Sequence, residues 1–253
     1  YESRDITINQ GATLTLAAGA VLNVCGNFYN YGSIIADPTS TIAFTGTGTQ
    51  NIYGSLVGAD KFGNLLINKS SGTVILNAGM EIAGDFTIQN STSIFNVNGQ
   101  YLKLAGNFLN AAGTTTFTGV SGSTIEFNGI ADQLYSPGGS LTLNDVFINQ
   151  GVPAAIVLTG NSMTISGSLT LTSGRIETLL NEVNVTNSTP AAVNAGNINS
   201  YVDGDLRRAT TVTGSYDFPV GHFLSGKGYQ LANIDFTAAN TATELLARFR
   251  PFS

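Results

Sequence analysis

Apolar and polar residues alternate in many short stretches between Tyr1 and Ser200. A period of two predicts β-strands with one buried face, because successive side chains of a strand point to opposite sides. Clusters of Gly, Asn, Ser and Asp separate the stretches and favour turns, and no stretch before Tyr201 sustains the 3.6 period of a helix. The alternating apolar pairs are Leu14/Leu16, Leu22/Val24, Ile42/Phe44, Phe86/Ile88, Leu102/Leu104, Ile125/Phe127, Leu141/Leu143 and Leu169/Leu171.

The strand pattern repeats once along the chain, at a nearly constant offset of about 80 residues, and such a fixed period is typical of repeat architectures. Six segments recur in the same order. They are Gly26–Phe28 with Gly106–Phe108, Ser40–Phe44 with Ser123–Phe127, Gln50 with Gln133, Ile67–Asn68 with Ile148–Asn149, Val74–Leu76 with Ile156–Leu158, and Met80–Gly84 with Met163–Gly167.

Short one-sided strands with a long repeat are compatible with a β-sandwich, a propeller or a β-solenoid. Similar strands recur roughly every 20 residues, whereas propeller blades repeat at about 40 to 45 residues. We therefore predict an all-β fold, a parallel β-helix (β-solenoid) with about four coils in each repeat. Leu104 and Phe127 are expected to point inward. Asn residues that follow strands are expected to stack their amides from coil to coil; these are Asn27, Asn68, Asn107 and Asn149.

The charge distribution changes near Ser200. Residues 1–200 hold five Lys/Arg and eleven Asp/Glu, whereas residues 201–253 hold five of each. We predict a parallel β-helix with two repeats over 1–200. An antiparallel β segment is predicted over 201–253, as a cap or the start of a following β domain. Within it, Asp203-Gly204 is expected to form a hairpin turn.

Composition removes several classes of function. Only 10% of the residues are charged, the formal net charge is −6 and there is no basic run, so nucleic-acid binding is not expected. No window approaches about 18 consecutive apolar residues, and Tyr1–Asp5 lacks the basic and apolar regions of a signal peptide, so membrane insertion is not expected. The single Cys25 excludes an internal disulfide and a cysteine-rich metal site, and it is predicted to be a small buried residue.

Two acid pairs are candidates for carbohydrate chemistry. A glycoside hydrolase needs two carboxylates about 5 to 9.5 Å apart, and Glu81/Asp85 and Asp132/Asp145 are the pairs considered. Neither pair recurs in the other repeat and each lies beside turn residues, so we expect solvated surface acids. A uronate lyase needs several basic groups, which residues 1–200 supply poorly.

The C-terminal segment offers two further candidates. Asp203 and Asp205 precede Arg207 and Arg208, a pattern compatible with a calcium or carboxylate site, although a hairpin with a surface ion pair is the favoured interpretation. His222 has no second His and no Cys nearby and is interpreted as a lone loop residue. No catalytic, metal or cofactor residue is therefore assigned, and no cofactor is expected.

Aromatic residues are the better candidates for recognition. Five tyrosines lie in or beside predicted turns, where a row of rings can stack on sugars or on a partner protein; filling of the core at coil corners is the alternative. A flat Thr array of the ice-binding kind is disfavoured because the Thr positions do not recur from coil to coil. The tyrosines are Tyr29, Tyr31, Tyr53, Tyr101 and Tyr135.

The chain resembles the long repetitive cell-surface proteins of Bacteroidetes that leave through the type IX secretion system, including the gliding-motility adhesins. The resemblance rests on the two GNF…STIxF units, on Ser173–Thr178, and on the ordered segments SYVDGDLRR, GSYDFPVG and YQLANIDF. The repeats alone are similar to many pectin-lyase-like β-helices. The resemblance implies a secreted, extracellular stalk or binding portion of a longer protein, although no sorting domain is visible.

From these observations we expect a non-enzymatic structural and binding segment of a surface adhesin. It would serve as a rigid spacer with shallow contacts to glycans or surfaces, and its further partners would be other surface proteins or the secretion machinery. The alternative hypothesis is a carbohydrate-active enzyme, a polysaccharide lyase or glycoside hydrolase on the same fold. A groove with clustered acids and Arg or Lys would favour the enzyme, and a carboxylate-poor surface would favour the adhesin.

Overall fold

Short β-strands provide nearly all of the regular structure of the chain. The computed structural model describes residues 5–223, 228–238 and 242–249, and within these ranges the only helical segments are three single 3-10 turns. Burial alternates along the strands, as in Thr73–Leu76, where Val74 and Leu76 are fully buried. The predicted all-β fold is therefore confirmed. None of the described helices has the length and apolar character needed to cross a membrane.

The chain forms two compact units, each described by itself. The first comprises residues 1–124 and 136–139, and the second comprises residues 125–135 and 140–253. The elements of the first unit are β1 (Ile6–Ile8), β2 (Thr13–Leu16), β3 (Val21–Val24), β4 (Phe28–Asn30), β5 (Ser33–Ala36), β6 (Thr41–Phe44), β7 (Gln50–Gly54), η1 (Gly58–Asp60), β8 (Asn64–Ile67), β9 (Thr73–Leu76), β10 (Met80–Ile82), β11 (Phe86–Ile88), β12 (Ile94–Asn96), β13 (Tyr101–Leu104), β14 (Phe108–Asn110), η2 (Thr114–Thr116) and β15 (Phe117–Thr118).

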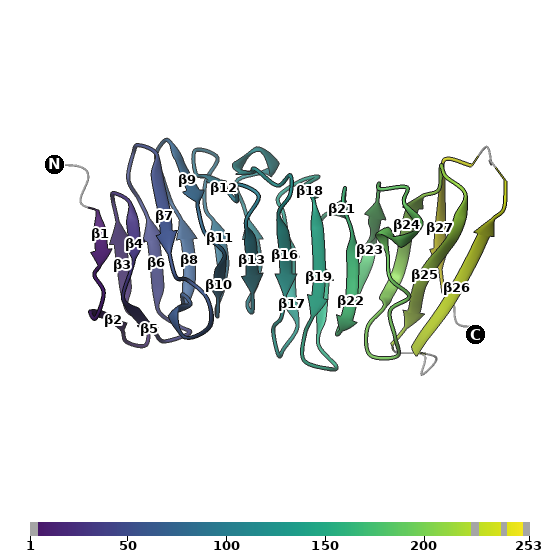
Figure 1. Cartoon of the computed structure of the whole chain (residues 1–253), viewed down its shortest axis with the longest axis horizontal. Coiled ribbons are helices and arrows are strands. Elements are labelled where there is room, and N and C mark those ends of the chain that lie inside the picture. The colour runs from purple at the N-terminus through teal and green to yellow at the C-terminus, as the bar shows by residue number, and fades with distance from the viewer. Residues whose placement is uncertain (1–4, 224–227, 239–241, 250–253) are drawn as a thin grey trace. The chain divides into compact units, whose positions relative to one another are not determined.

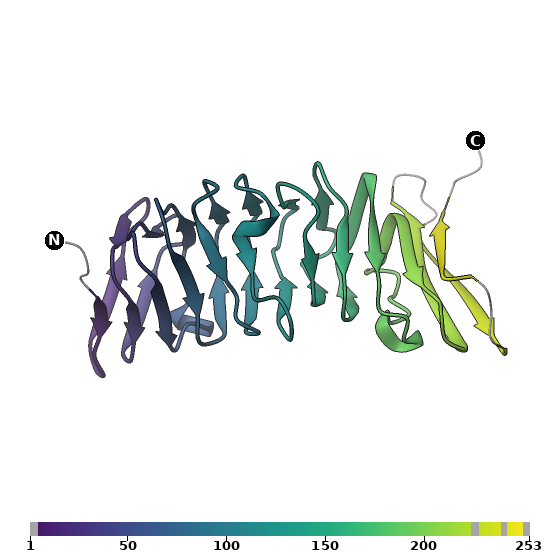
Figure 2. The ribbon, with the colours of Figure 1, turned by 90° about the horizontal axis from the view of Figure 1, so that it is seen from above.

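Strands of the first unit pair in parallel with the strand one coil further along the chain. One sheet runs in the order β1-β4-β7-β9-β12-β15 and another contains β3-β6-β8-β11-β14, while β2 pairs with β5 and β10 with β13 (Figures 1 and 2). Ile6 lies beside Phe28, and Phe28 lies beside Ile52, so each step along this sheet is one full coil of the chain. This arrangement confirms the predicted parallel β-solenoid.

Inward side chains fill the interior of the first unit. Phe86 makes an edge contact with Phe108, with ring centroids 5.6 Å apart, and Phe95 stacks on Phe117 at 5.9 Å. The predicted inward position of Leu104 is confirmed, since its side chain is fully buried. Aromatic pairs of this kind stabilise a core beyond the free energy of area burial.

Polar side chains at coil corners form a second set of contacts between coils. The Asn51 backbone N–H and side-chain amide donate to Asn27 Oδ1 at 2.8 and 3.2 Å, and Asn77 Nδ2 donates to Asn51 Oδ1 at 3.1 Å. Asn90 Nδ2 likewise donates to Asn68 Oδ1 at 2.9 Å, and Asn107 donates to Asp85. The predicted amide stacking is confirmed at Asn27 and Asn68, whereas Asn107 and Asn149 donate to the carboxylates of Asp85 and Glu126 of a neighbouring coil.

The long sequence repeat does not map one coil onto another. Phe28 of the first GNF unit lies in the sheet that contains β4, whereas Phe108 of the second lies in the sheet that contains β14. Coil length also varies, since position 155 pairs with 175 whereas position 28 pairs with 52. The expectation that one repeat spans about four whole coils is therefore wrong, because the offset is not a whole number of coils and moves the motif to another side of the solenoid.

The second unit contains the remaining strands. Its parallel columns are β16-β19-β22 and β17-β20-β23-β24, and β21 pairs with both β18 and β23. Phe127 is fully buried, which confirms its predicted inward position. The elements are β16 (Thr124–Phe127), β17 (Gln133–Ser136), β18 (Thr142–Leu143), β19 (Asp145–Asn149), β20 (Ala155–Leu158), β21 (Met163–Ile165), β22 (Leu169–Ser173), β23 (Arg175–Val185), η3 (Pro190–Ala192), β24 (Val202–Ala209), β25 (Gly214–His222), β26 (Gly228–Phe236) and β27 (Glu244–Arg248).

Strand direction changes within the last strands of the second unit. β24 is parallel to β23 and pairs in parallel with β25 at Val202–Val220, whereas β26 is antiparallel to β25 and β27 is antiparallel to β24. The expected antiparallel C-terminal segment is present, but parallel pairing extends past Ser200. The domain division at Ser200 stays a prediction, and residues 224–227, 239–241 and 250–253 of the expected segment lie outside the described residues.

The expected hairpin turn at Asp203-Gly204 is wrong. Both residues lie inside β24. Gly204 has a φ of 130°, and a Cβ at this position would lie 1.9 Å from Thr178 Oγ1 of the neighbouring strand. The glycine therefore permits close approach of two strands instead of a reversal of the chain.

One corner of the first unit buries a lysine. Lys69 is fully buried, and its Nζ donates to Gln50 Oε1 and to the Gly46 carbonyl, both at 2.5 Å. In the second unit the corresponding repeat positions hold a neutral pair, in which Gln150 Nε2 donates to Gln133 Oε1 at 3.0 Å. Burial lowers the pKa of Lys69 to about 8, because a low-dielectric environment disfavours the ammonium form.

This lowered pKa predicts a pH-dependent stability. Between pH 8 and the unfolded-state pKa of 10.5, the unfolded chain binds more protons at Lys69 than the folded chain, so the free energy of unfolding rises with pH. Over this whole pH range, the titration of Lys69 raises the free energy of unfolding by about 3 kcal/mol. In urea titrations from pH 7.5 to 9.5, the stability of the wild type relative to Lys69→Met should increase with pH. Lys103→Met, at a side chain 29% exposed beside Glu81, is the control; equal pH slopes for both variants would contradict the assignment.

Candidate functional site

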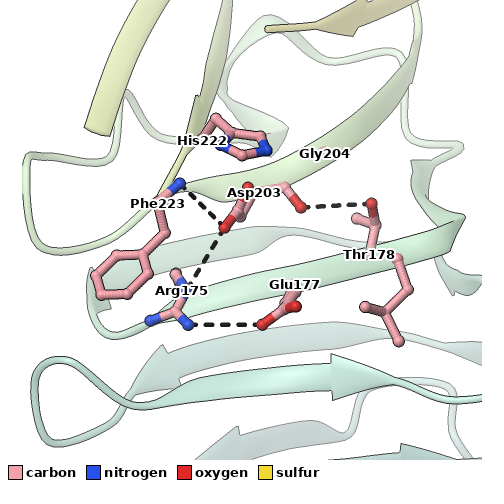
Figure 3. Close-up of a pocket in the computed structure, with 8 residues that line it drawn as sticks. Arg175, Glu177, Thr178, Asp203, Gly204, His222 and Phe223 are labelled. Carbon is pink, nitrogen blue, oxygen red and sulfur yellow. Dashed lines mark hydrogen bonds and ion pairs between the residues drawn. The ribbon is translucent and has the colours of Figure 1, made fainter. Parts of the chain in front are cut away.

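A cavity of about 300 Å3 opens in the second unit beside β23, β24 and the end of β25 (Figure 3). Its wall combines charged, hydroxyl, apolar and aromatic groups. The lining residues are Arg175, Glu177, Thr178, Leu179, Asp203, Gly204, His222 and Phe223.

Parallel stacking brings these residues together from three strands. Arg175 and Glu177 are two positions apart in β23 and flank the fully buried Ile176, so both lie on the opposite face from the core. Glu177 is the register neighbour of Asp203 in β24, and Asp203 is the neighbour of Gly221 in β25. His222 and Phe223 follow Gly221 and complete the wall.

Arg175 is the central residue of the cavity. Its guanidinium lies 3.5 Å from Glu177 Oε2 and 3.6 Å from Asp203 Oδ2, it packs 4.0 Å from the centre of the Phe223 ring, and it donates to the Pro153 carbonyl. Asp203 Oδ2 also accepts from the Phe223 backbone N–H at 3.2 Å. The two carboxylates therefore share one guanidinium as their ion-pair partner.

One polar atom of this cluster lacks a hydrogen bond. Arg175 is 9% exposed, and its Nε has no hydrogen-bond partner among the residues that the structure describes. The nearest carboxylate oxygen, on Asp203, is beyond hydrogen-bond distance. An unsatisfied buried donor costs free energy, and because Arg175 Nε is itself enclosed, this cost is borne by the fold.

A bulge in β23 forms one side of the cavity. Pairing with β24 shifts between Glu177 and Glu182, which places a four-residue stretch of β23 opposite a single residue of its partner, Gly204. Within the bulge Leu179 has a φ of 53°, a left-handed conformation that is strained for a branched side chain. Leu179 is 56% exposed and Leu180 is fully exposed. Bulges and strained residues often lie beside functional sites.

The residues considered beside Asp203 do not share its site. Asp205 pairs with Arg248, and Arg207 forms ion pairs with Glu182 at 2.9 Å and Glu244 at 2.8 Å. The hydrogen bond from Arg207 to Glu182 raises the pKa of Arg207. Arg207 thus forms surface ion pairs, but with Glu182 and Glu244 instead of the expected Asp203 or Asp205, and the four residues considered together do not share one site.

Arg208 has a structural position inside the second unit. It is fully buried and donates to the backbone carbonyls of Asp217 at 2.6 Å and Pro190 at 2.8 Å. Burial lowers the pKa of Arg208 to about 10. Its guanidinium also lies 5.1 Å from the centre of the Tyr216 ring. Arg208 therefore holds the C-terminal strands together and is not available to a ligand.

The two acid pairs considered from the sequence bind backbone groups. Glu81 accepts from the Gly58 N–H at 2.7 Å and lies 3.5 Å from Lys103, whereas Asp85 accepts from the Asn107 N–H at 2.8 Å. Asp132 accepts from the Ala155 N–H at 2.8 Å, and Asp145 from the Ser168 N–H at 2.7 Å. These carboxylates connect successive coils, which is a structural role.

Three of the five candidate tyrosines form a stack on the first unit. The rings of Tyr29 and Tyr53 are parallel within 1° with centroids 5.3 Å apart, and Tyr31 stacks on Tyr29 at 6.2 Å. Tyr31 is 58% exposed and Tyr53 is 36% exposed. Partial burial, with smaller contributions from Asp5 and the neighbouring tyrosines, raises the pKa of Tyr29.

The other two tyrosines differ from the stack. Tyr101 is 39% exposed and lies in β13, in another sheet. Tyr135 is fully buried, as the core-filling alternative expects, and burial raises the pKa of its phenol well above the ordinary value.

Metal-binding side chains are not clustered in the described part of the chain, where no group of three or more His, Cys, Asp or Glu is placed to hold a metal ion. Cys25 is exposed and its Sγ lies 3.6 Å from Thr45 Oγ1, so its predicted burial is wrong. Cys25 follows β3 at the point where the chain leaves the strand, and there its side chain turns outward. Comparison of the chain with protein-family models, curated proteins and solved structures gave no match.

The strain at Leu179 predicts that substitution of two neighbouring leucines by glycine has different effects on the free energy of unfolding. Leu179→Gly removes a left-handed leucine, whose conformation costs about 1–2 kcal/mol, and should leave the free energy of unfolding unchanged or raise it. Leu180→Gly, the control, has no such strain to relieve and should lower it by about 0.5–1 kcal/mol. Chemical denaturation measures both, and an equal loss of stability in the two variants would show that Leu179 is not strained.

Proposed function

We propose that the chain is a non-enzymatic structural and binding segment of a longer extracellular adhesin at the cell surface. In this proposal the solenoid is a stiff spacer that holds shallow contact surfaces for glycans or other surfaces. Other surface proteins or secretion machinery are further proposed partners. The resemblance to type IX secreted and gliding-motility adhesins of Bacteroidetes supports the same assignment.

Stiffness follows from the contacts between coils. Parallel backbone pairing continues over successive coils within each unit, and amide-to-amide hydrogen bonds such as those among Asn27, Asn51 and Asn77 fix the corners. Each coil is thereby held by its neighbours, as in other solenoids. Side chains on the outer face then have fixed spacing, which is what repeated weak contacts need for avidity.

The observation that carries the binding part of this proposal is the tyrosine stack. Tyr29 and Tyr53 are register neighbours in β4 and β7, and Tyr31 follows β4, so three stacked rings lie side by side. Stacking covers part of the ring faces, and Tyr31 and Tyr53 still present exposed surface to solvent. This surface matches shallow contact with a glycan or a surface better than enclosure of a substrate.

The cavity around Arg175 supports the alternative, a carbohydrate-active enzyme. It holds two carboxylates, an arginine and a histidine, which is the kind of cluster expected for catalysis. Against catalysis, Glu177 and Asp203 both form ion pairs with the same guanidinium, and Asp203 also accepts from the Phe223 N–H. A glycoside hydrolase requires two carboxyl groups that flank the scissile bond, whereas these two are held by one arginine, so the non-enzymatic proposal is preferred.

Adhesion of the immobilised chain tests the proposal. On a panel of glycan-coated surfaces, the Tyr31→Ala/Tyr53→Ala variant should bind about fivefold or more weakly, because each ring contact contributes about 0.5–1.5 kcal/mol. Tyr101→Ala, an exposed tyrosine outside the stack, is the matched control and should bind as the wild type does. Absence of wild-type adhesion would contradict the proposal. Release of reducing or unsaturated sugar that is lost in Glu177→Gln would establish the enzyme instead.

A further inference from the structure

We propose that the cavity around Arg175 is a binding site for one pyranose ring of a neutral glycan. This inference rests on the proposed glycan-binding function and assigns it a defined site, in the second unit and separate from the tyrosine stack. The observations that carry it are the guanidinium of Arg175 between the carboxylates of Glu177 and Asp203 (Figure 3), and the apolar side chains of Leu179 and Phe223 in the same lining.

The cavity wall presents both hydrogen-bond donors and hydrogen-bond acceptors to a ligand. Arg175 supplies guanidinium N–H groups, and the Glu177 and Asp203 carboxylates beside it are acceptors only. Vicinal hydroxyl groups of a sugar both accept and donate hydrogen bonds, so neighbouring atoms of one ring match both kinds of group.

Exposure shows which carboxylate is available to such a ligand. The Glu177 side chain is 32% exposed, whereas the Asp203 side chain is 11% exposed and already accepts from the Phe223 N–H. Glu177 is therefore the residue expected to accept from a ligand hydroxyl, and Asp203 is expected to orient Arg175.

The apolar part of the wall matches the C–H face of a pyranose. Leu179 is 56% exposed and Phe223 is 44% exposed, on two different strands or their ends. The Arg175 guanidinium covers Phe223 at 4.0 Å from the ring centre and fixes the ring orientation. The bulge of β23, in which Leu179 has a left-handed φ of 53°, forms this side of the cavity.

The charge of the cavity wall and the volume of the cavity restrict the class of ligand further. Two carboxylates against one guanidinium give the wall a net negative charge, which disfavours uronic acids and other anionic sugars. A cavity of about 300 Å3 is at the lower limit for small-molecule sites, so it matches one ring and not a longer oligosaccharide. The terminal residue of a glycan is the part of a chain that can enter it.

Titration calorimetry of the full chain with methyl glycosides tests the site. The probes are the methyl glycosides of glucose, galactose and mannose, together with methyl glucuronide and methyl galacturonide. At least one neutral glycoside should bind with a millimolar Kd, and both uronides should bind at least about tenfold more weakly. Binding of no neutral glycoside below about 50 mM, or tighter binding of a uronide, would overturn the proposal.

Substitutions locate the binding. Glu177→Gln keeps the side-chain shape and should weaken the bound neutral glycoside about tenfold, through loss of a charged acceptor. Glu244→Gln removes a carboxylate that pairs with Arg207 outside the cavity and should leave the Kd unchanged. Phe223→Leu, which removes the ring, provides a second variant if Glu177→Gln does not fold. Unchanged affinity in a folded Glu177→Gln or Phe223→Leu would show that the sugar binds elsewhere.

The same measurements separate failure of this site from failure of the proposed function. If no glycoside binds but the immobilised wild type still adheres to glycan surfaces, the site is refuted and the adhesin proposal stands. If a glycoside or oligosaccharide is turned over at the cavity, the site is confirmed as a sugar site and the non-enzymatic proposal is refuted.

Discussion

Hydrogen bonding between equivalent positions of successive coils is the constraint on which the rest of each unit depends. A parallel strand satisfies its backbone groups only when the next coil lies in register with it, so side chains are forced into rows of neighbours. Side chains that point inward pack on the equivalent side chain of the next coil, as Phe95 does on Phe117. Side chains that point outward form amide hydrogen bonds between coils or stack, as Tyr29 does on Tyr53. A buried polar residue such as Lys69 is tolerated because its row and corner supply acceptors.

The period-two pattern is sufficient to predict strands and the inward position of Leu104, because these depend on local alternation. The recurrence of strands about every 20 residues predicts the parallel stacking, and the Asn residues after strands predict the amide contacts at Asn27 and Asn68. Coil length was not predictable in the same way. The GNF and STIxF motifs predict a local turn followed by a strand, but they do not specify which sheet of the solenoid that strand joins. Phe28 and Phe108, from the two GNF motifs, lie in different sheets. The predicted burial of Cys25 and the predicted turn at Asp203-Gly204 are wrong for a common reason. The direction in which a side chain leaves the end of a strand, and the close approach of two strands, are both set by neighbouring coils, which the local sequence does not specify.

The cavity around Arg175 could be predicted only in part. The spacing of Arg175 and Glu177 places both on one face of a strand, a relation visible in the sequence. Their meeting with Asp203 and His222 depends on a register that includes the bulge after Glu177, and no alternation signals a bulge. β-Bulges often lie beside functional sites, and here the interrupted pairing lets side chains from several coils line one cavity.

A pair of engineered cysteines gives the most direct test of in-register parallel stacking. Thr15 and Ile35 are exposed register neighbours in β2 and β5, whereas Ser33 lies two positions from that register. With Cys25 replaced by Ser, Thr15→Cys/Ile35→Cys should form a disulfide on mild oxidation. Thr15→Cys/Ser33→Cys, with Cα atoms about 8 Å apart by strand geometry, should stay reduced. The opposite outcome, detected by mass spectrometry of peptides, would contradict the stacking on which the whole account depends.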